Sequence, residues 1–390
     1  MKQARLMMLC ASLVQFGCTE SRASIDAERW DSAGVEMLSY SSLTHKGSLQ
    51  VSAEPAVWIE GDARIPPFDR ITAVTILRDS SIVVADQGAS QVHAFGADGS
   101  YLWSAGRPGG GPGEFQRLEQ LFVTGNDTIL AVDPRSRRIT VLSPTGDYVR
   151  DDRFPESVGS PVALLASEEV VYLDQQRTDA HTVGVHHTSA TWSAADPAGA
   201  AVRELLTTPG HDSYYGIASG RNVIFNPSFL RHVYVVPLMT GFALALSDEG
   251  RIDQHGRGGE LLRSVLIPDE LLSVEVADPQ AVRDGLLESV PPAMQDGFRS
   301  LVQDLPVPAR WPPIGGLIAD DAHRLWVQEY QASREDEITW HVFAADGTHL
   351  DQVTTPGGFT PRVVRHDVVA GVWRDELDVQ SVRLYRVLAR

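Results

Sequence analysis

The chain has 390 residues and a formal net charge of -18 at pH 7. A surface this acidic repels phosphate backbones, because nucleic-acid binding rests mainly on Lys and Arg side chains that neutralise phosphates, so we expect no nucleic-acid partner. Apolar residues make up 43% of the chain, alongside 33 Gly and 23 Pro. This composition argues against disorder and suits many short strands around a buried core.

The N-terminus has the layout of a secretory signal peptide, which we place at residues 1–23. Basic residues precede an apolar run over residues 6–14 that is too short to span a bilayer. Cleavage before Cys18 would make the chain a lipoprotein lipidated at that residue, whereas residues 21–23 offer a conventional cleavage site. We therefore expect an exported protein, either a periplasmic or cell-envelope lipoprotein or a secreted protein. It would meet a membrane only through an N-terminal lipid anchor.

An internal repeat is the strongest signal in the chain. Residues 68–99 align with residues 115–146 at a constant offset, and a repeat of this length is typical of a propeller blade. In each copy a short apolar run is followed by a polar turn, a partner strand and a hairpin glycine, Gly99 or Gly146. We count five such units, which begin near Phe68, Phe115, Ser160, Tyr214 and Ile314.

A sixth unit is expected to be shared between the two ends of the chain. Residues 363–388 offer two further strands, and an early strand at residues 56–59 would complete that blade. Pairing a terminal strand into the opposite end's blade closes the ring and removes its open edges. The sequence therefore predicts an all-β, six-bladed β-propeller over residues 56–390, preceded by a lead-in segment over residues 24–55.

One stretch breaks the β pattern, and we place a helical insertion at about residues 268–312, between the fifth and sixth repeat units. Asp278 followed by Pro279 is typical of a helix start, and apolar residues then recur at helical spacing from Met294 to Leu305. Two interpretations stay open. The insertion is either an amphipathic cover that buries its own apolar stripe or a lid over a ligand channel.

The glycine-rich segment over residues 106–115 resembles the linker between blades in NHL repeats, which ends in Gly, Glu or Gln, and Phe. The strand ends at residues 84–86 and 131–133 resemble the Ala-Asp strand ends of the same repeats. Residues 31–35 resemble the opening of a family of exported bacterial six-bladed propellers of unassigned function. These resemblances imply the fold and export, and they imply no particular chemistry.

The candidate ligand-binding residues are arginines. Arg70 and Arg117 occupy the same position in their repeats, and Arg362 is a looser third copy. Arginines that converge at the channel mouth could hold a carboxylate, a sulfate or an acidic sugar by forked hydrogen bonds. The alternative is that each arginine pairs with groups of its own repeat. Asp86, Asp133 and Asp174 recur at strand ends, where a carboxylate organises the following turn.

The sequence favours a non-enzymatic binding scaffold over an enzyme. We expect it to present the channel mouth to a peptide, glycan or protein partner, and we assign no catalytic residue and no cofactor. The alternative is a metal-dependent hydrolase or lyase of the lactonase or peptidyl-hydroxyglycine lyase kind, with calcium or zinc as the metal. The histidines of the chain show no spacing typical of a metal site, so the sequence assigns no ligands to such an ion.

Overall fold

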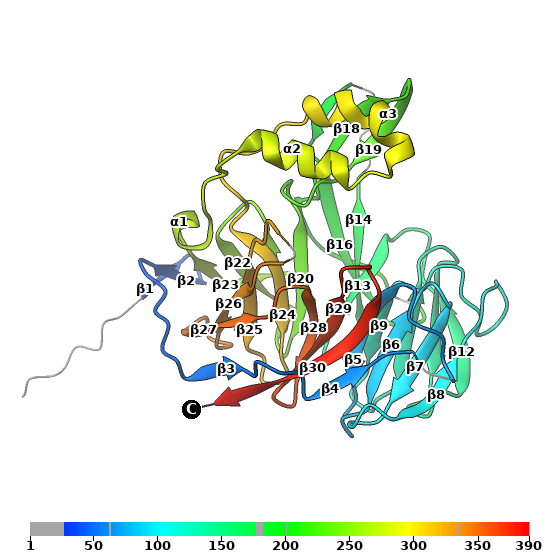
Figure 1. Cartoon of the computed structure of the whole chain (residues 1–390). Helices are drawn as coiled ribbons and strands as arrows, with labels where there is room; N and C mark the ends of the chain where they lie inside the picture. The colour runs from blue at the N-terminus through cyan, green and yellow to red at the C-terminus, as the bar shows by residue number, and fades with distance from the viewer. Residues whose placement is uncertain (1–26, 62–63, 177–181, 200, 334, 390) are drawn as a thin grey trace, which may run out of the picture.

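The structure is a computed structural model that describes residues 27–61, 64–176, 182–199, 201–333 and 335–389. The predicted signal peptide, Cys18 included, lies outside these residues. Figure 1 shows a ring of twisted β-sheets with a cap of helices and short strands on one face. The described part of the chain contains no helix with the length and apolarity needed to cross a bilayer.

Six sheets form the blades of the ring, and the chain passes through them in order. Blade 1 comprises β5 (Ile71–Ile76), β6 (Ile82–Asp86), β7 (Gln91–Phe95) and β8 (Tyr101–Ala105), and blade 2 comprises β9 (Gln120–Val123), β10 (Ile129–Asp133), β11 (Arg138–Leu142) and β12 (Tyr148–Arg153). Blade 3 comprises β13 (Ser160–Leu164), β14 (Val170–Gln175), β16 (Ser189–Ala195) and β17 (Arg203–Pro209).

The second half of the ring follows the same antiparallel pattern. Blade 4 comprises β20 (Val233–Leu238), β21 (Gly241–Leu246), β22 (Arg251–Gly256) and β23 (Leu261–Leu266), and blade 5 comprises β24 (Ile314–Ala319), β25 (Leu325–Glu329), β26 (Ile338–Phe343) and β27 (His349–Thr355). Blade 6 contains β28 (Phe359–Arg365), β29 (Val368–Arg374) and β30 (Gln380–Ala389). The first strands of successive blades contact one another around the axis, and β28 meets β5 to complete the circle. The predicted six-bladed propeller is confirmed.

The second strand of a blade is covered on both faces by neighbouring blades. Every residue of β6 and of β10 is buried. Side chains of the two blades interlock, with Val83 and Ala85 of blade 1 in one apolar cluster with Leu121 and Ile129 of blade 2. This double coverage explains why the runs that form these strands are almost entirely apolar rather than alternating.

Strands from the N-terminal segment close the ring. β4 (Val57–Ile59) pairs with β30 antiparallel, with Ile59 opposite Val382, and β3 (Leu49–Val51) pairs with the end of the same strand. The expected early strand at residues 56–59 is therefore confirmed as part of blade 6. Because both ends of the chain meet in one sheet, opening the ring requires breaking this pairing.

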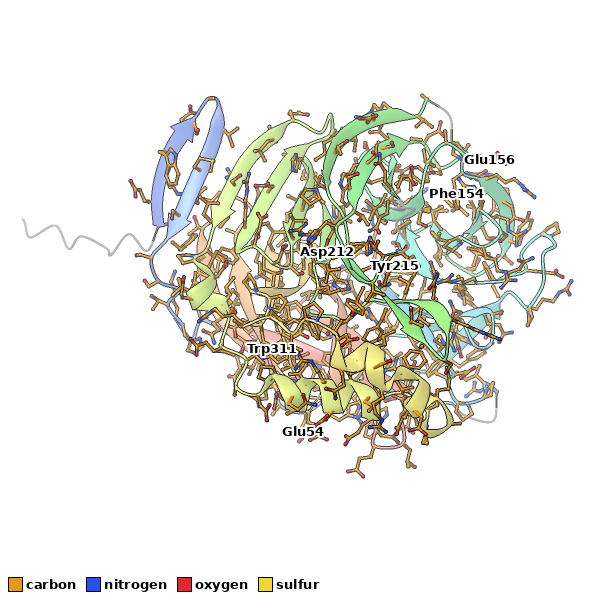
Figure 2. All side chains as sticks on the ribbon, turned by 90° about the horizontal axis from the view of Figure 1, so that it is seen from above. Glu54, Phe154, Glu156, Asp212, Tyr215 and Trp311 are labelled. Atoms are coloured by element: carbon orange, nitrogen blue, oxygen red, sulfur yellow. The ribbon has the colours of Figure 1, made fainter. Side chains whose placement is uncertain are left out.

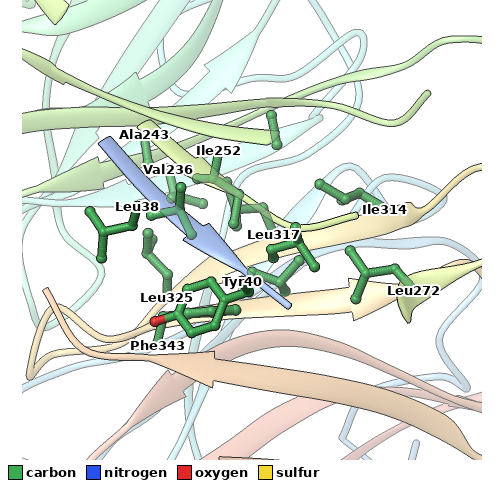
Figure 3. Packing of buried hydrophobic residues seen from close by; sticks show 14 of the residues in the cluster. Leu38, Tyr40, Val236, Ala243, Ile252, Leu272, Ile314, Leu317, Leu325 and Phe343 are labelled. Atoms are coloured by element: carbon green, nitrogen blue, oxygen red, sulfur yellow. The ribbon is translucent and has the colours of Figure 1, made fainter. Parts of the chain in front are cut away.

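The segment expected as a simple lead-in also belongs to the ring. The hairpin of β1 (Ala27–Ser32) and β2 (Val35–Tyr40) extends blade 4, because β2 pairs parallel with β23. Figure 3 shows Leu38 and Tyr40 of this hairpin packed among side chains of blades 4 and 5. Tyr40 lies edge-on to Phe343 of blade 5 with ring centroids 5.7 Å apart, so the hairpin joins two blades.

A buried carboxylate fixes the chain between β2 and β3. The side chain of Asp351 in blade 5 accepts hydrogen bonds from the backbone N–H groups of Lys46, Gly47, Ser48 and Leu49 at 2.6 to 3.1 Å. Burial opposes its ionisation, yet the hydrogen bonds from Leu49 and Ser48 outweigh this and hold the pKa of Asp351 well below its usual value. The ionised carboxylate therefore stabilises the path of the N-terminal segment.

The cap helices lie within the predicted residues 268–312, but the prediction assigned them to the wrong pair of blades. They are α1 (Asp269–Leu272), α2 (Pro279–Glu288) and α3 (Pro292–Gln303), and they lie between β23 and β24. The insertion therefore falls between blades 4 and 5, one blade earlier than we predicted. The predicted start is confirmed, because the Asp278 side chain accepts hydrogen bonds from the N–H groups of Gln280 and Ala281 ahead of the first turn.

A small sheet completes the cap and corrects the predicted fourth unit. β15 (Gly184–His186), β18 (Ser213–Ala218) and β19 (Arg221–Phe225) form a three-stranded sheet of their own. Tyr214, expected near the start of a blade, lies in this sheet, and the fourth blade begins instead at Val233. Tyr214 and Leu301 of α3 share one apolar cluster, so the cap buries its own stripe, whereas Met294 is 50% exposed.

We predict that Asp351→Asn lowers the free energy of unfolding by about 3 kcal/mol near neutral pH, because the amide cannot accept all of the hydrogen bonds made to the charged group. Since the pKa of Asp351 is depressed in the folded state, its contribution is complete above the unfolded pKa of about 4 and is lost progressively as pH falls from there toward the folded pKa. Urea unfolding at neutral pH and at a pH of about 3.5 measures the loss of stability in the variant and its dependence on pH.

The control is Asp31→Asn, because this exposed carboxylate accepts one hydrogen bond within its own hairpin, from Gly34. We expect the control to change stability by less than about 0.5 kcal/mol. Equal stabilities of the Asp351→Asn variant and the unchanged chain at both pH values would contradict the role given to this carboxylate.

Candidate ligand-binding site

The insertions all lie on one face of the ring. In a meander of four strands, the link from one blade to the next leaves the ring on the same face as the link between the second and third strands. The cap is built from three such connections, between β14 and β16, β17 and β20, and β23 and β24. Figure 1 shows them gathered on one side of the ring, and we call this side the capped face.

The cap is fixed to the ring through aromatic side chains. Trp311, which follows the cap helices, stacks on Tyr330 of blade 5 with ring centroids 5.1 Å apart, and the Tyr330 hydroxyl lies 2.7 Å from that of Ser228. Figure 2, a view onto the capped face, shows Trp311 beside the cap helices over one side of the ring. These contacts hold the cap above blade 5 and beside the loops of blade 6.

A large cavity opens on the capped face between blades 5 and 6, with a volume of about 1010 Å³. Its walls are the loop between β25 and β26, the loop between β27 and β28, and the loop between β29 and β30. The lining residues are Gln331, Glu335, Gly357, Gly358, Phe359, Thr360, Arg362, Val372, Trp373, Arg374, Asp375, Glu376, Leu377 and Asp378. We call this space the blade 5–6 cavity, and its size suits a ligand of several residues or sugar units.

Arg362 is placed in this cavity by a β-bulge. The pairing of β28 with β29 shifts between Pro361 and Val363, so Arg362 is the extra residue. A bulge re-aims a side chain and leaves the extra residue outside the regular ladder. The first strand of blade 1 has the same irregularity at Thr72, between Ile71 and Ala73. The site therefore uses a recurrent feature of the inner strands, with an arginine at that position in blade 6.

The guanidinium of Arg362 has no hydrogen bond or ion pair with any residue that the structure describes. Its loss of contact with bulk water lowers its pKa, and the positive charge of Arg374 lowers it further. Arg374 itself donates to Asp378 at 3.1 Å. Arg362 is nevertheless exposed to solvent, and a cation without a partner among the described residues, beside a second cation, favours the approach of an anion.

Glycines allow the walls of the cavity to approach each other. A side chain on Gly357 would place its Cβ 2.0 Å from the carbonyl oxygen of Glu335, so the loops of blade 5 touch through backbone. Gly358 has φ of +76°, a conformation that L side chains rarely adopt. Trp373 forms part of the wall, and the Arg383 guanidinium covers its ring at 3.7 Å from the centroid.

The rim of the cavity is acidic and partly apolar. The carboxylates of Glu335 and Glu376 form no ion pair with any described residue, whereas Asp375 accepts the N–H groups of Leu377 and Val379 and so shapes its loop. The Leu377 side chain is 84% exposed, the highest value for a large apolar side chain in the described part of the chain. The cavity thus combines a cation on β28 with carboxylates and an exposed apolar side chain on the surrounding loops.

The other two predicted arginines do not line the blade 5–6 cavity. Both precede first strands and so lie toward the capped face, but Arg70 donates to Gln87 at 2.9 Å and Arg117 pairs with Glu119 at 2.5 Å. Both arginines therefore match the alternative expectation, in which each arginine pairs with groups of its own repeat. The strand register also makes Thr360, rather than Arg362, the equivalent of Arg70.

Two of the three repeated strand-end carboxylates, Asp86 and Asp133, have the predicted structural role. The carboxylate of the third, Asp174, is exposed within β14 and accepts no hydrogen bond from a residue that the structure describes, so the prediction is wrong there. Asp86 accepts hydrogen bonds from the N–H groups of Arg70 and Gly88 at 3.1 and 3.0 Å, and Asp133 accepts from Gln116 at 2.7 Å. Each carboxylate joins the turn after the second strand to the start of the first strand in the same blade. Sequence reasoning identified these aspartates from their repetition, whereas Trp373 and the loop of blade 6 carry no repeated signal.

Comparison with known proteins supports the class of protein that this fold defines, a six-bladed β-propeller. Residues 67–241 match the model of a family described as a 6-bladed β-propeller, DUF5128. None of the curated proteins compared with the chain matches it.

Solved structures agree at the level of the fold. A protein named as exported, from Bacteroides fragilis NCTC 9343, has a TM-score of 0.51 and 13% identity over 91% of this chain and 99% of its own. A DUF4221 family member from Bacteroides vulgatus ATCC 8482 has the same TM-score, 0.51, with 8% identity over 88% of this chain and 99% of its own. A gluconolactonase from Xanthomonas campestris reaches a TM-score of 0.45 at 12% identity, over 89% of this chain and 94% of its own, which says nothing about chemistry.

We predict that Arg362→Gln changes the free energy of unfolding by less than about 0.5 kcal/mol, because Arg362 is exposed and has no hydrogen-bond or ion-pair partner among the described residues. Arg365→Gln in the same strand is the matched control. Arg365 donates to the carbonyl oxygen of Ile76 in blade 1, so its loss should lower stability by about 1 kcal/mol. Urea unfolding measures both, and equal destabilisation of the two variants would show that Arg362 has a structural partner.

Proposed function

We propose that the protein is an exported binding protein that holds an anionic group of a peptide, glycan or protein partner in the blade 5–6 cavity. Arg362 carries this proposal, because its guanidinium lines the cavity and has no partner among the residues that the structure describes. Export rests on the N-terminal signal expected from the sequence and on the exported protein of similar fold.

The physical support is electrostatic. A guanidinium offers two parallel N–H donors to a carboxylate, sulfate or phosphate, and such charged hydrogen bonds contribute about 1.5 to 3 kcal/mol each. Arg374 adds positive potential at the inner part of the cavity, since it is the charged neighbour that lowers the pKa of Arg362. An anion bound there would relieve the repulsion between the two arginines.

A metal-dependent hydrolase or lyase stays an alternative predicted from the sequence alone. Within the residues that the structure describes, no group of three or more His, Cys, Asp or Glu side chains is arranged to hold one ion. This alternative therefore has no residues assigned to it, and no calcium or zinc site is proposed.

We predict that Arg362→Gln weakens binding at least about tenfold, a loss of about 1.4 kcal/mol, because it removes the forked donor to the anion. The probes are a pool of hexapeptides with free carboxyl termini and an oligogalacturonate, each tested with the mature chain by affinity selection and mass spectrometry. Arg70→Gln is the control, because Arg70 lies on the same face but pairs with Gln87.

The proposal fails if neither probe binds the unchanged chain. It also fails if a probe binds the Arg362→Gln variant as tightly as it binds the unchanged chain.

A further inference from the structure

We infer that the blade 5–6 cavity binds the carboxyl-terminal end of a polypeptide that carries a basic residue a few positions upstream. The inference rests on the proposed function and names the class of ligand for that site. It joins three features of the cavity: Arg362 on β28, the carboxylates of Glu335 and Glu376 on the loops, and the exposed side chain of Leu377. Arg362 and these two carboxylates have no ion-pair partner among the residues that the structure describes.

The charges of the protein favour a peptide over an acidic glycan as the ligand of this cavity. The chain has a net charge of -18, and the cavity lining contains four acidic side chains, Glu335, Asp375, Glu376 and Asp378, against the two arginines Arg362 and Arg374. A polymer of uronic or sulfated sugars brings a negative charge on most units and is repelled by such a surface. A polypeptide brings a single terminal carboxylate and can carry cationic side chains elsewhere.

The positions of the charges fit that ligand. Arg362 lies on the first strand of blade 6, whereas Glu335 and Glu376 lie on the loops that form the outer walls. A terminal carboxylate paired with Arg362 would leave the preceding residues to pass the rim. There a Lys or Arg side chain would meet carboxylates that have no other ion-pair partner among the described residues.

Apolar contacts favour a peptide as well. Leu377 is 84% exposed and Val379 is 48% exposed, both on the loop that borders the cavity. Contact with an apolar residue of a ligand would remove apolar surface of these side chains from water, which favours binding. The indole of Trp373 is covered by Arg383 at 3.7 Å, which leaves less open aromatic surface for stacking a sugar ring.

The backbone also suits an extended chain. β28 is the end strand of its sheet and pairs with β29 alone, so its other edge faces the axis of the ring. Residues Phe359 and Thr360 of this edge strand line the cavity beside Arg362. The N–H and C=O groups along a free edge are the groups that bind an extended peptide by strand addition.

The test compares two pools of random hexapeptides that differ at one group, the carboxyl terminus, which is free in one pool and amidated in the other. Each pool is incubated with the mature chain, and retained peptides are identified by mass spectrometry. We expect at least tenfold greater retention from the free-acid pool, with enrichment of Lys or Arg upstream of the last residue. Arg362→Gln should abolish the difference between the pools, and Arg70→Gln should retain it.

A second variant separates the two parts of the inference. Replacing both Glu335 and Glu376 by Gln should remove the enrichment of basic residues and leave the preference for the free acid. Equal retention of free-acid and amidated peptides would overturn the inference. Retention of free acids without upstream basic residues would overturn the role given to the rim.

The failure of the inference can be told apart from that of the proposed function. Binding of an oligogalacturonate that depends on Arg362, without binding of peptides, would refute the peptide class and keep the anion site. Binding of neither probe would refute both.

Discussion

The structure depends on one pairing, that of the N-terminal strands β3 and β4 with the C-terminal strand β30. A ring of blades packed face to face is stable only if its first and last blades are joined, because each open blade would expose an apolar face and a free edge. Here the junction consists of hydrogen bonds within blade 6, where the C-terminal strand β30 pairs with β3 and β4, and the chain continues from β4 into blade 1. Gln380 of β30 also accepts a hydrogen bond from the backbone N–H of Ile71 in blade 1.

The proposed site lies on the blade that closes the ring. β28 and β29 of this blade supply Arg362 and Trp373, and their register is fixed by β30 on one side and by blade 1 on the other. In blades 1 and 2 the carboxylates of Asp86 and Asp133 accept hydrogen bonds from backbone N–H groups and so fix the loops of these blades. Between blades 5 and 6 the loops approach through glycines and leave a cavity lined by Arg362, which has no partner in the described part of the chain. The ordered loops of blades 1 and 2 and the cavity between blades 5 and 6 are therefore built on the same repeated unit, and they differ in the residues of their loops.

The sequence was sufficient to predict the ring, because double burial makes the second strand of a blade apolar and because blades 1 and 2 repeat it at a constant offset. It was not sufficient for blade 4, because Tyr214 lies in a strand that alternates like a blade strand but pairs with β15 in the cap. The arginines show the same limit. Arg70, Arg117 and Arg362 were found by position in a repeat, yet a bulge in β28 and pairing partners near the first two decide which of them lines the cavity. Bulges and loop contacts depend on tertiary packing, which local patterns do not record.

Amide hydrogen exchange measured with and without the most retained free-acid peptide tests the central claim most directly, because exchange slows where a ligand covers backbone N–H groups. The account predicts slower exchange in the loops over residues 330–337, 356–358 and 375–379, and unchanged exchange in the corresponding loops of blades 1 and 2. Protection confined to the cap or to blades 1 to 3, with the loops of blades 5 and 6 unchanged, would contradict it.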